Sequence, residues 1–141
     1  MTQEEEKDLL SKDLCSRLPY NTICQVEFKN CGKYETKNMT LSGIFKDEAY
    51  FTIENGSVYS NNYKPYLFPL SSMTEEQKKY ITDRWGINEE FDFEINPDWG
   101  EYFVELGDIV DFIDWLNKNH FDYRGLIEKG LAIDATNLNI Y

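Results

Sequence analysis

The sequence predicts an α+β fold in which one helix precedes a small, strongly bent antiparallel sheet and further helices follow. Three observations predict it: a capped helical pattern at the start of the chain, short β-prone segments between residues 22 and 69, and helical patterns after residue 70. The closely spaced strands also fit an SH3-like barrel.

The chain of 141 residues is long enough for one domain with a sizeable core. We therefore expect residues 1–141 to form a single compact domain. A β-rich sub-lobe over residues 1–70 and a helical, acidic sub-lobe over residues 71–141 would share it.

The first helix is expected to begin after Thr2. Thr2 and Glu5 have the spacing of a capping box, in which each side chain bonds the other residue's backbone N–H. Pro19 ends the helix, because a proline ring clashes with the preceding turn. Four leucines at helical spacing form its apolar stripe: Leu9, Leu10, Leu14 and Leu18.

Five β-prone segments follow, at residues 22–29, 39–45, 49–54, 57–60 and 64–69. Asn55-Gly56 joins the third to the fourth and predicts a tight hairpin, because both turn positions of such hairpins favour positive φ. Pro65 and Pro69 favour an extended last segment.

The second half predicts two helices with a second short hairpin between them. Residues 71–86 carry two candidate capping boxes, Ser72 with Glu75 and Thr74 with Gln77, and Gly86 suits the helix end. Residues 91–95 alternate apolar and acidic side chains and are expected to pair with residues 102–106. The last helix is expected from Asp108 to about Asn119, with an apolar face formed by Ile109, Phe112, Ile113 and Leu116.

Composition excludes several classes of partner. The net charge of −12 argues against direct binding to nucleic acid or to an anionic membrane, because each phosphate neutralised needs a Lys or Arg. No apolar run approaches the roughly 20 residues that span a bilayer. The acidic N-terminus has the features of neither a signal peptide nor a transit peptide.

Three irregularly spaced cysteines favour reduced thiols in the cytoplasm, although Cys24 and Cys31 are close enough in sequence to meet in a hairpin. A single histidine cannot complete a common zinc set, and we expect no metal or other cofactor.

The most distinctive feature is residues 85–117, which we call the acidic segment. It contains ten acids and no Lys or Arg, so it contributes −10 of the chain's −12. Aromatic residues alternate with the acids. One interpretation is that the aromatics form the core and the acids a solvated face. A second is an acidic docking surface for a basic partner, and a third is a site for a hard cation, for which the EF-hand spacing is absent.

On the docking interpretation, the residues expected to bind the partner lie mainly between 89 and 114. They are Glu89, Glu90, Asp92, Glu94, Asp98, Trp99, Glu101, Glu105, Asp108, Asp111 and Asp114.

A catalytic interpretation centres on His120, the only histidine, with Asp122 and Arg124 nearby in sequence. Asp122 could orient the imidazole, and the three residues would form a pocket against the β-rich half. The alternative is that His120 caps a helix end and that Arg124 pairs with Asp122 or with an acid of the last helix. All three cysteines lie in the first 31 residues without a nucleophile signature.

Three segments together, LLSKDLCSRLPY (9–20), KPYLFPLSSMTEEQKKY (64–80) and DWLNKNHFDYRGLIEKGLAID (114–134), resemble a family of small uncharacterised proteins from Bacteroidales genomes, prophages and mobile elements. The family often has Arg where this chain has Phe68. The resemblance implies a phage or mobile-element origin and an intracellular setting. It implies no activity and transfers no catalytic residues.

We therefore expect a non-enzymatic, cytoplasmic interaction protein that binds a basic surface on a host or phage protein. An inhibitor of a defence or nucleic-acid-handling protein is the most specific form of this expectation. The alternative is a small enzyme or ligand-binding module that uses His120, Asp122 and Arg124. A third alternative is a homo-oligomer built on exposed aromatics such as Tyr59, Tyr63 and Tyr66.

Overall fold

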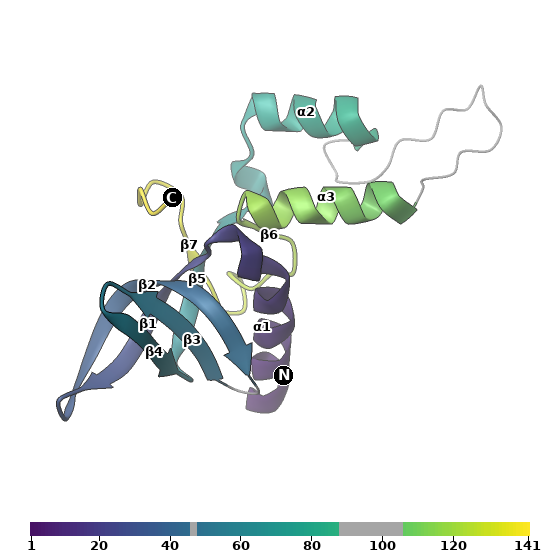
Figure 1. Ribbon diagram of the computed structural model, residues 1–141. Helices are drawn as coiled ribbons and strands as arrows, with labels where there is room; N and C mark the ends of the chain where they lie inside the picture. Colours follow the sequence, from purple (N-terminus) through teal and green to yellow (C-terminus); the bar gives the residue numbers. More distant parts are fainter. Residues whose placement is uncertain (46–47, 88–105) are drawn as a thin grey trace, which may run out of the picture.

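The structure is a computed structural model that describes residues 1–45, 48–87 and 106–141. It confirms the α+β class: helix α1 precedes the sheet and lies beside it, and helices α2 and α3 lie beyond one end of the sheet (Figure 1). The helices are α1 (Gln3–Arg17), α2 (Glu75–Trp85) and α3 (Leu106–Lys118), with short 3-10 turns at Leu18–Tyr20 and Leu70–Ser72. The strands are β1 (Ile23–Asn30), β2 (Lys33–Phe45), β3 (Glu48–Ile53), β4 (Gly56–Ser60), β5 (Tyr63–Pro69), β6 (Phe121–Asp122) and β7 (Ile133–Asp134).

The sheet has the order β4-β3-β2-β1-β5-β6, and β7 also pairs with β5. The pairs that β1 to β5 form with one another are antiparallel, whereas β6 and β7 run parallel to β5. The sheet is not closed into a barrel, so the SH3-like alternative is wrong. The second hairpin predicted from residues 91–95 and 102–106 lies outside the described residues, apart from Leu106, which begins α3.

Helix α1 begins as its sequence predicts. The Thr2 hydroxyl accepts a hydrogen bond from the Glu5 backbone N–H at 3.2 Å, and the Glu5 carboxylate accepts one from the Thr2 N–H at 2.7 Å. This exchange satisfies two donors that a helix start leaves without partners. Leu10 and Leu14 are buried, and with the sheet they form the first core of the fold.

The two hairpins of the sheet use different turns. Cys31 and Gly32 both have positive φ (51° and 83°) between the paired residues Asn30 and Lys33. This is the left-handed turn that suits the strand twist. The predicted hairpin near residue 55 is present, but its turn positions are not Asn55-Gly56. Gly56 pairs with Ile53, so Glu54 and Asn55 form the turn, and Asn55 does not have positive φ.

Strand β2 is longer than expected, because pairing begins at Lys33 rather than at residue 39. Residues 33–38 are exposed or half-buried, so no apolar alternation marks them in the sequence. Backbone pairing with β1 holds this part of the strand, and the β1–β2 hairpin therefore extends beyond the core.

Helix α2 uses the second of its two candidate capping boxes. Thr74 caps it through the Gln77 N–H, and the Gln77 side chain accepts from the Thr74 N–H at 2.9 Å. The Ser72 hydroxyl instead donates to the Pro69 carbonyl. Gly86 closes the helix with φ 66°, as predicted.

A second core joins α2, α3 and β6 through aromatic rings. Trp85, Phe112 and Phe121 are buried in it, and the half-buried Trp115 stacks against Phe121 at a ring-centroid distance of 5.7 Å. Leu126 and Ala132, which follow β6, pack in the first core instead. The end of the chain, from β6 onward, thus contributes to both cores. That residues 1–141 form a single domain stays a prediction.

Candidate functional site

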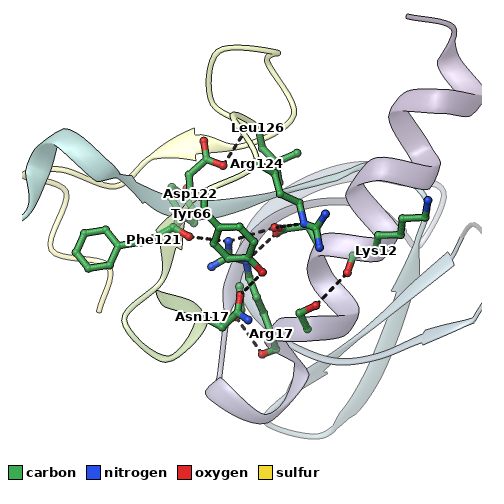
Figure 2. A network of polar contacts seen from close by, with 12 residues as sticks. Lys12, Arg17, Tyr66, Asn117, Phe121, Asp122, Arg124 and Leu126 are labelled. Carbon is green, nitrogen blue, oxygen red and sulfur yellow. Dashed lines mark hydrogen bonds and ion pairs between the residues drawn. The ribbon is translucent and has the colours of Figure 1, made fainter. Parts of the chain in front are cut away.

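The strongest polar cluster in the described part of the chain centres on Arg17, at the end of α1. Its Nε donates to Asp13 Oδ2 at 2.7 Å and its Nη2 to Asp13 Oδ1 at 3.2 Å, which is the paired geometry that suits guanidinium and carboxylate. Nη2 also donates to the Phe121 carbonyl at 2.7 Å (Figure 2). Both side chains are 0% exposed. The pair therefore ties α1 to β6, which is more than a hundred residues away in the chain.

Arg124 is the third member of this cluster. Its Nε lies 3.4 Å from Asp13 Oδ1, and its side chain is 34% exposed. The Tyr123 ring lies within 5.2 Å of the Arg17 guanidinium carbon and 5.4 Å of that of Arg124. The Tyr123 hydroxyl donates to Asn117 Oδ1 at 2.9 Å. The predicted partner of Arg124, Asp122 or an acid of the last helix, was therefore wrong: the partner is Asp13 on α1.

Asp122 holds the chain that follows β6. Its two carboxylate oxygens accept hydrogen bonds from the backbone N–H groups of Leu126 (2.9 Å, Figure 2) and Ile127 (3.0 Å). The residue is buried, so both bonds satisfy donors that water reaches poorly. This carboxylate does not orient an imidazole; it orders a turn.

His120 follows α3 in the left-handed conformation, with φ 62°. Its ring stacks on Tyr141 with centroids 3.6 Å apart, and its carbonyl accepts from the Phe68 N–H at 2.8 Å. Burial lowers the pKa of His120 to about 4, and the positive charge of Arg17 acts in the same direction. The imidazole is therefore neutral near pH 7, and the Tyr141 ring covers one of its faces.

The Tyr141 side chain fixes the other half of that stack. Its hydroxyl donates to the Tyr66 carbonyl at 2.8 Å and accepts from the Ile23 N–H at 3.0 Å. Burial raises the pKa of the Tyr141 hydroxyl. His120, Asp122 and Arg124 thus have separate partners: a tyrosine ring, two backbone amides and a buried carboxylate. In the described part of the chain, no hydrogen bond, ion pair or ring contact joins any two of these three side chains.

Sequence reasoning missed Asp13 and Arg17. Their spacing of four on a helix is a signal for an ion pair. Most such pairs lie on helix surfaces, however, and nothing local to α1 reveals that Tyr123, Arg124 and the Phe121 carbonyl cover this one.

Most of the predicted partner-binding residues lie outside the described residues. These are Glu89, Glu90, Asp92, Glu94, Asp98, Trp99, Glu101 and Glu105. The other three, Asp108, Asp111 and Asp114, lie on α3. Arg84 of α2 lies 3.8 Å from Asp108 and 3.7 Å from Asp111, and all three side chains are substantially exposed. One guanidinium therefore faces two carboxylates, and Asp114 is exposed without an ion pair to any described residue.

The proposed tyrosine surface for self-association is mostly buried. Tyr63 and Tyr66 are core residues, 7% and 5% exposed. The Tyr66 hydroxyl donates to Asn38 Oδ1 at 2.7 Å. Tyr59 alone of these three is exposed, at 65%. Tyr63 and Tyr66 therefore cannot form an exposed contact surface in this fold.

Several further observations bear on the class of protein. Cys15, Cys24 and Cys31 are free thiols. Across the described ranges, no three His, Cys, Asp or Glu residues are grouped so as to hold a metal ion. None of the helices described has the length and apolar character needed to cross a membrane. No family model matches the chain, and neither the curated proteins nor the solved structures give a match.

Proposed function

We propose that this protein is a non-enzymatic binding protein whose acidic segment docks on a basic surface of another protein. The observation that carries the proposal is the distribution of charge. The acidic segment contributes −10, whereas the remaining residues of the chain sum to −2 against a total of −12. Negative charge concentrated in one segment destabilises the fold, because the carboxylates repel one another. A general need for solubility would be met by acids spread along the chain, so it does not explain this concentration.

The described end of the acidic segment supports this proposal. On α3, Asp108 and Asp111 share the single guanidinium of Arg84, and Asp114 is exposed. Contacts of 3.7 Å and 3.8 Å between half-exposed groups are weak, since water screens them. A basic partner could therefore displace the Arg84 guanidinium at a small cost in free energy and bind the carboxylates of Asp108 and Asp111 in its place.

The same geometry gives little support to the enzymatic alternative. A general base acts on a substrate that a pocket brings within its reach. Two pockets in the described part of the chain are lined by residues other than His120, Asp122 and Arg124. The Asp122 carboxylate holds two backbone amides, and Asp13 holds Arg17 and Arg124. The His120 ring is covered on one face by Tyr141.

The resemblance to proteins of phages and mobile elements supports a narrower form of the proposal. The partner would be a basic host or phage protein of the cytoplasm, such as a defence or nucleic-acid-handling protein whose positive surface normally meets phosphates.

Affinity capture with matched charge variants tests the proposal. One bait reverses Glu89, Glu90, Glu101 and Glu105 to Lys. The control bait reverses four acids outside the acidic segment, Glu4, Glu54, Glu76 and Glu128, which are exposed and lack ion pairs to other described residues. Each set raises the net charge by eight units, from −12 to −4.

Quantitative mass spectrometry should find a basic protein that the wild-type and control baits retain and the first variant loses. A partner retained equally by both variants would contradict docking through the acidic segment. A partner lost equally by both would show that only total charge matters.

A further inference from the structure

A groove of about 1080 Å³ crosses the sheet of β1 to β4, and residues 139–140 near the end of the chain form part of its wall. Ligand sites in proteins commonly enclose roughly 300–1,000 Å³, so this groove is large enough for an extended ligand. None of the residues proposed for the acidic docking surface lines it. A ligand of this groove would therefore be distinct from the partner proposed for the acidic segment.

Three hydroxyl side chains form a row across the floor of the groove. Thr40 pairs with Thr52, and Thr52 pairs with Ser57, so the three lie side by side on β2, β3 and β4. Neighbouring strands are about 4.8 Å apart. Leu41 and Phe51, their neighbours along the strands, are buried in the first core, and the hydroxyl row therefore faces away from α1.

The hydroxyl row is available to a ligand. Thr52 and Ser57 are exposed and Thr40 is half-buried. Their hydroxyl groups form no hydrogen bond with another residue in the described part of the chain. Asn55, in the turn between β3 and β4, likewise keeps its amide free at the rim of the groove. Each hydroxyl or amide can both donate and accept a hydrogen bond.

An aromatic ring lies beside the row. Tyr59 is two residues after Ser57 on β4, so it projects from the same face, and it is 65% exposed. Its ring centroid is 6.1 Å from that of Tyr50 on the neighbouring strand. A tyrosine held in this way offers a flat apolar surface with a polar edge.

The net charge of the residues that line the groove indicates which class of ligand suits it. Its charged lining consists of Lys29, Lys37 and Glu54, which sum to +1 in a chain of −12. A nucleic acid would need a lysine or arginine for each phosphate neutralised, and here two lysines share the site with a glutamate. A neutral ligand carries no such requirement.

From the hydroxyl row, the exposed tyrosine and the near-neutral lining, we propose that this groove binds a neutral oligosaccharide. The Thr, Ser and Asn side chains would exchange hydrogen bonds with sugar hydroxyls, and the Tyr59 ring would pack on the apolar face of a pyranose. This site is independent of the acidic segment, so either proposal can fail alone.

Titration of the isotope-labelled full chain with neutral oligosaccharides, followed by NMR, tests the proposal. The probes are cellohexaose, xylohexaose, maltohexaose and chitohexaose, with oligothymidylate as the anionic probe. At least one sugar should shift the amide signals of Thr40, Thr52 and Ser57 saturably and equally at low and high salt. If no sugar shifts them, or only oligothymidylate does, the proposal is overturned.

Matched tyrosine variants then locate the contact. Tyr59→Ala should weaken binding of the active sugar by about tenfold, because a tyrosine covered by its ligand is among the side chains that contribute most to binding. Tyr34→Ala is the control, since Tyr34 is 72% exposed and does not line the groove. Thr52→Val, which removes only a hydroxyl, should also weaken binding. Unchanged affinity in Tyr59→Ala, or equal losses in both tyrosine variants, would place the sugar elsewhere.

Discussion

The buried ion pair between Asp13 and Arg17 predicts a large and non-additive effect on stability. Asp13→Leu leaves a completely buried guanidinium with the Phe121 carbonyl as its remaining hydrogen-bond partner. Removal of one partner from a buried pair costs about 3–5 kcal/mol in the free energy of unfolding. Arg17→Met should cost less, because Arg124 still lies 3.4 Å from Asp13.

The double variant, Asp13→Leu with Arg17→Met, should be more stable than the two separate losses predict. It leaves no isolated charge in the interior, and Arg124 is exposed enough to turn toward water. We expect a coupling energy of about 2 kcal/mol between the two positions. Asp13→Asn, which keeps the shape and removes the charge, should fall between the wild type and Asp13→Leu.

Urea unfolding, followed by circular dichroism and tryptophan fluorescence, measures these free energies. The dependence on urea should be the same in all variants, so that the midpoints report stability. Lys37→Met is the control, because the Lys37–Glu35 pair is 3.9 Å long and exposed, and its loss should cost about 0.5 kcal/mol or less. A cost for Asp13→Leu no larger than that for Lys37→Met, or strictly additive losses in the double variant, would refute the role given to this pair.

Three further effects follow from the same contacts. Because the pKa of His120 is about 4 in the folded state and 6.5 when unperturbed, stability should fall as the pH drops from 6.5 to 4. We expect a loss of about 1 kcal/mol in the free energy of unfolding, a figure already discounted because solvent screens this part-exposed ring. His120→Asn, whose new side chain tolerates the left-handed backbone, should remove this pH dependence in the same urea assay. Asp122→Ala should cost about 2 kcal/mol, because two amide donors lose their acceptor, and Asp122→Asn should restore part of it. Burial raises the pKa of the Cys24 thiol, so a thiol reagent should modify two cysteines in the native protein and the third only after unfolding. Rapid labelling of all three in the native protein would contradict the buried position of Cys24.

Local sequence signals predicted three helix ends, but not the start of α3, which begins at Leu106 rather than at Asp108. The capping boxes at Thr2 and Thr74 and the glycine at residue 86 lie where the helices begin and end, because caps depend on residues three or four apart. The first part of β2 was missed for the opposite reason. Its side chains face solvent, and only its pairing with β1 makes it a strand.

Contacts between distant segments were beyond reach of the sequence. Arg124 was identified as paired, but its partner lies on α1, and β6 and β7 pair with β5 across more than fifty residues. Two-residue strands carry no alternation that a sequence can display. The hydroxyl row of the groove likewise depends on the register of three strands, which their separate sequences do not specify.

The salt dependence of binding to the captured partner tests the central proposal most directly. Between about 0.1 M and 1 M salt the screening length falls from about 10 Å to about 3 Å, which weakens attraction between exposed charges. If the acidic segment docks on a basic surface, the dissociation constant should rise steeply over this range. The variant with Glu89, Glu90, Glu101 and Glu105 reversed should show little binding at any salt concentration. A dissociation constant that stays level as salt increases, and that survives these reversals, would contradict the proposal.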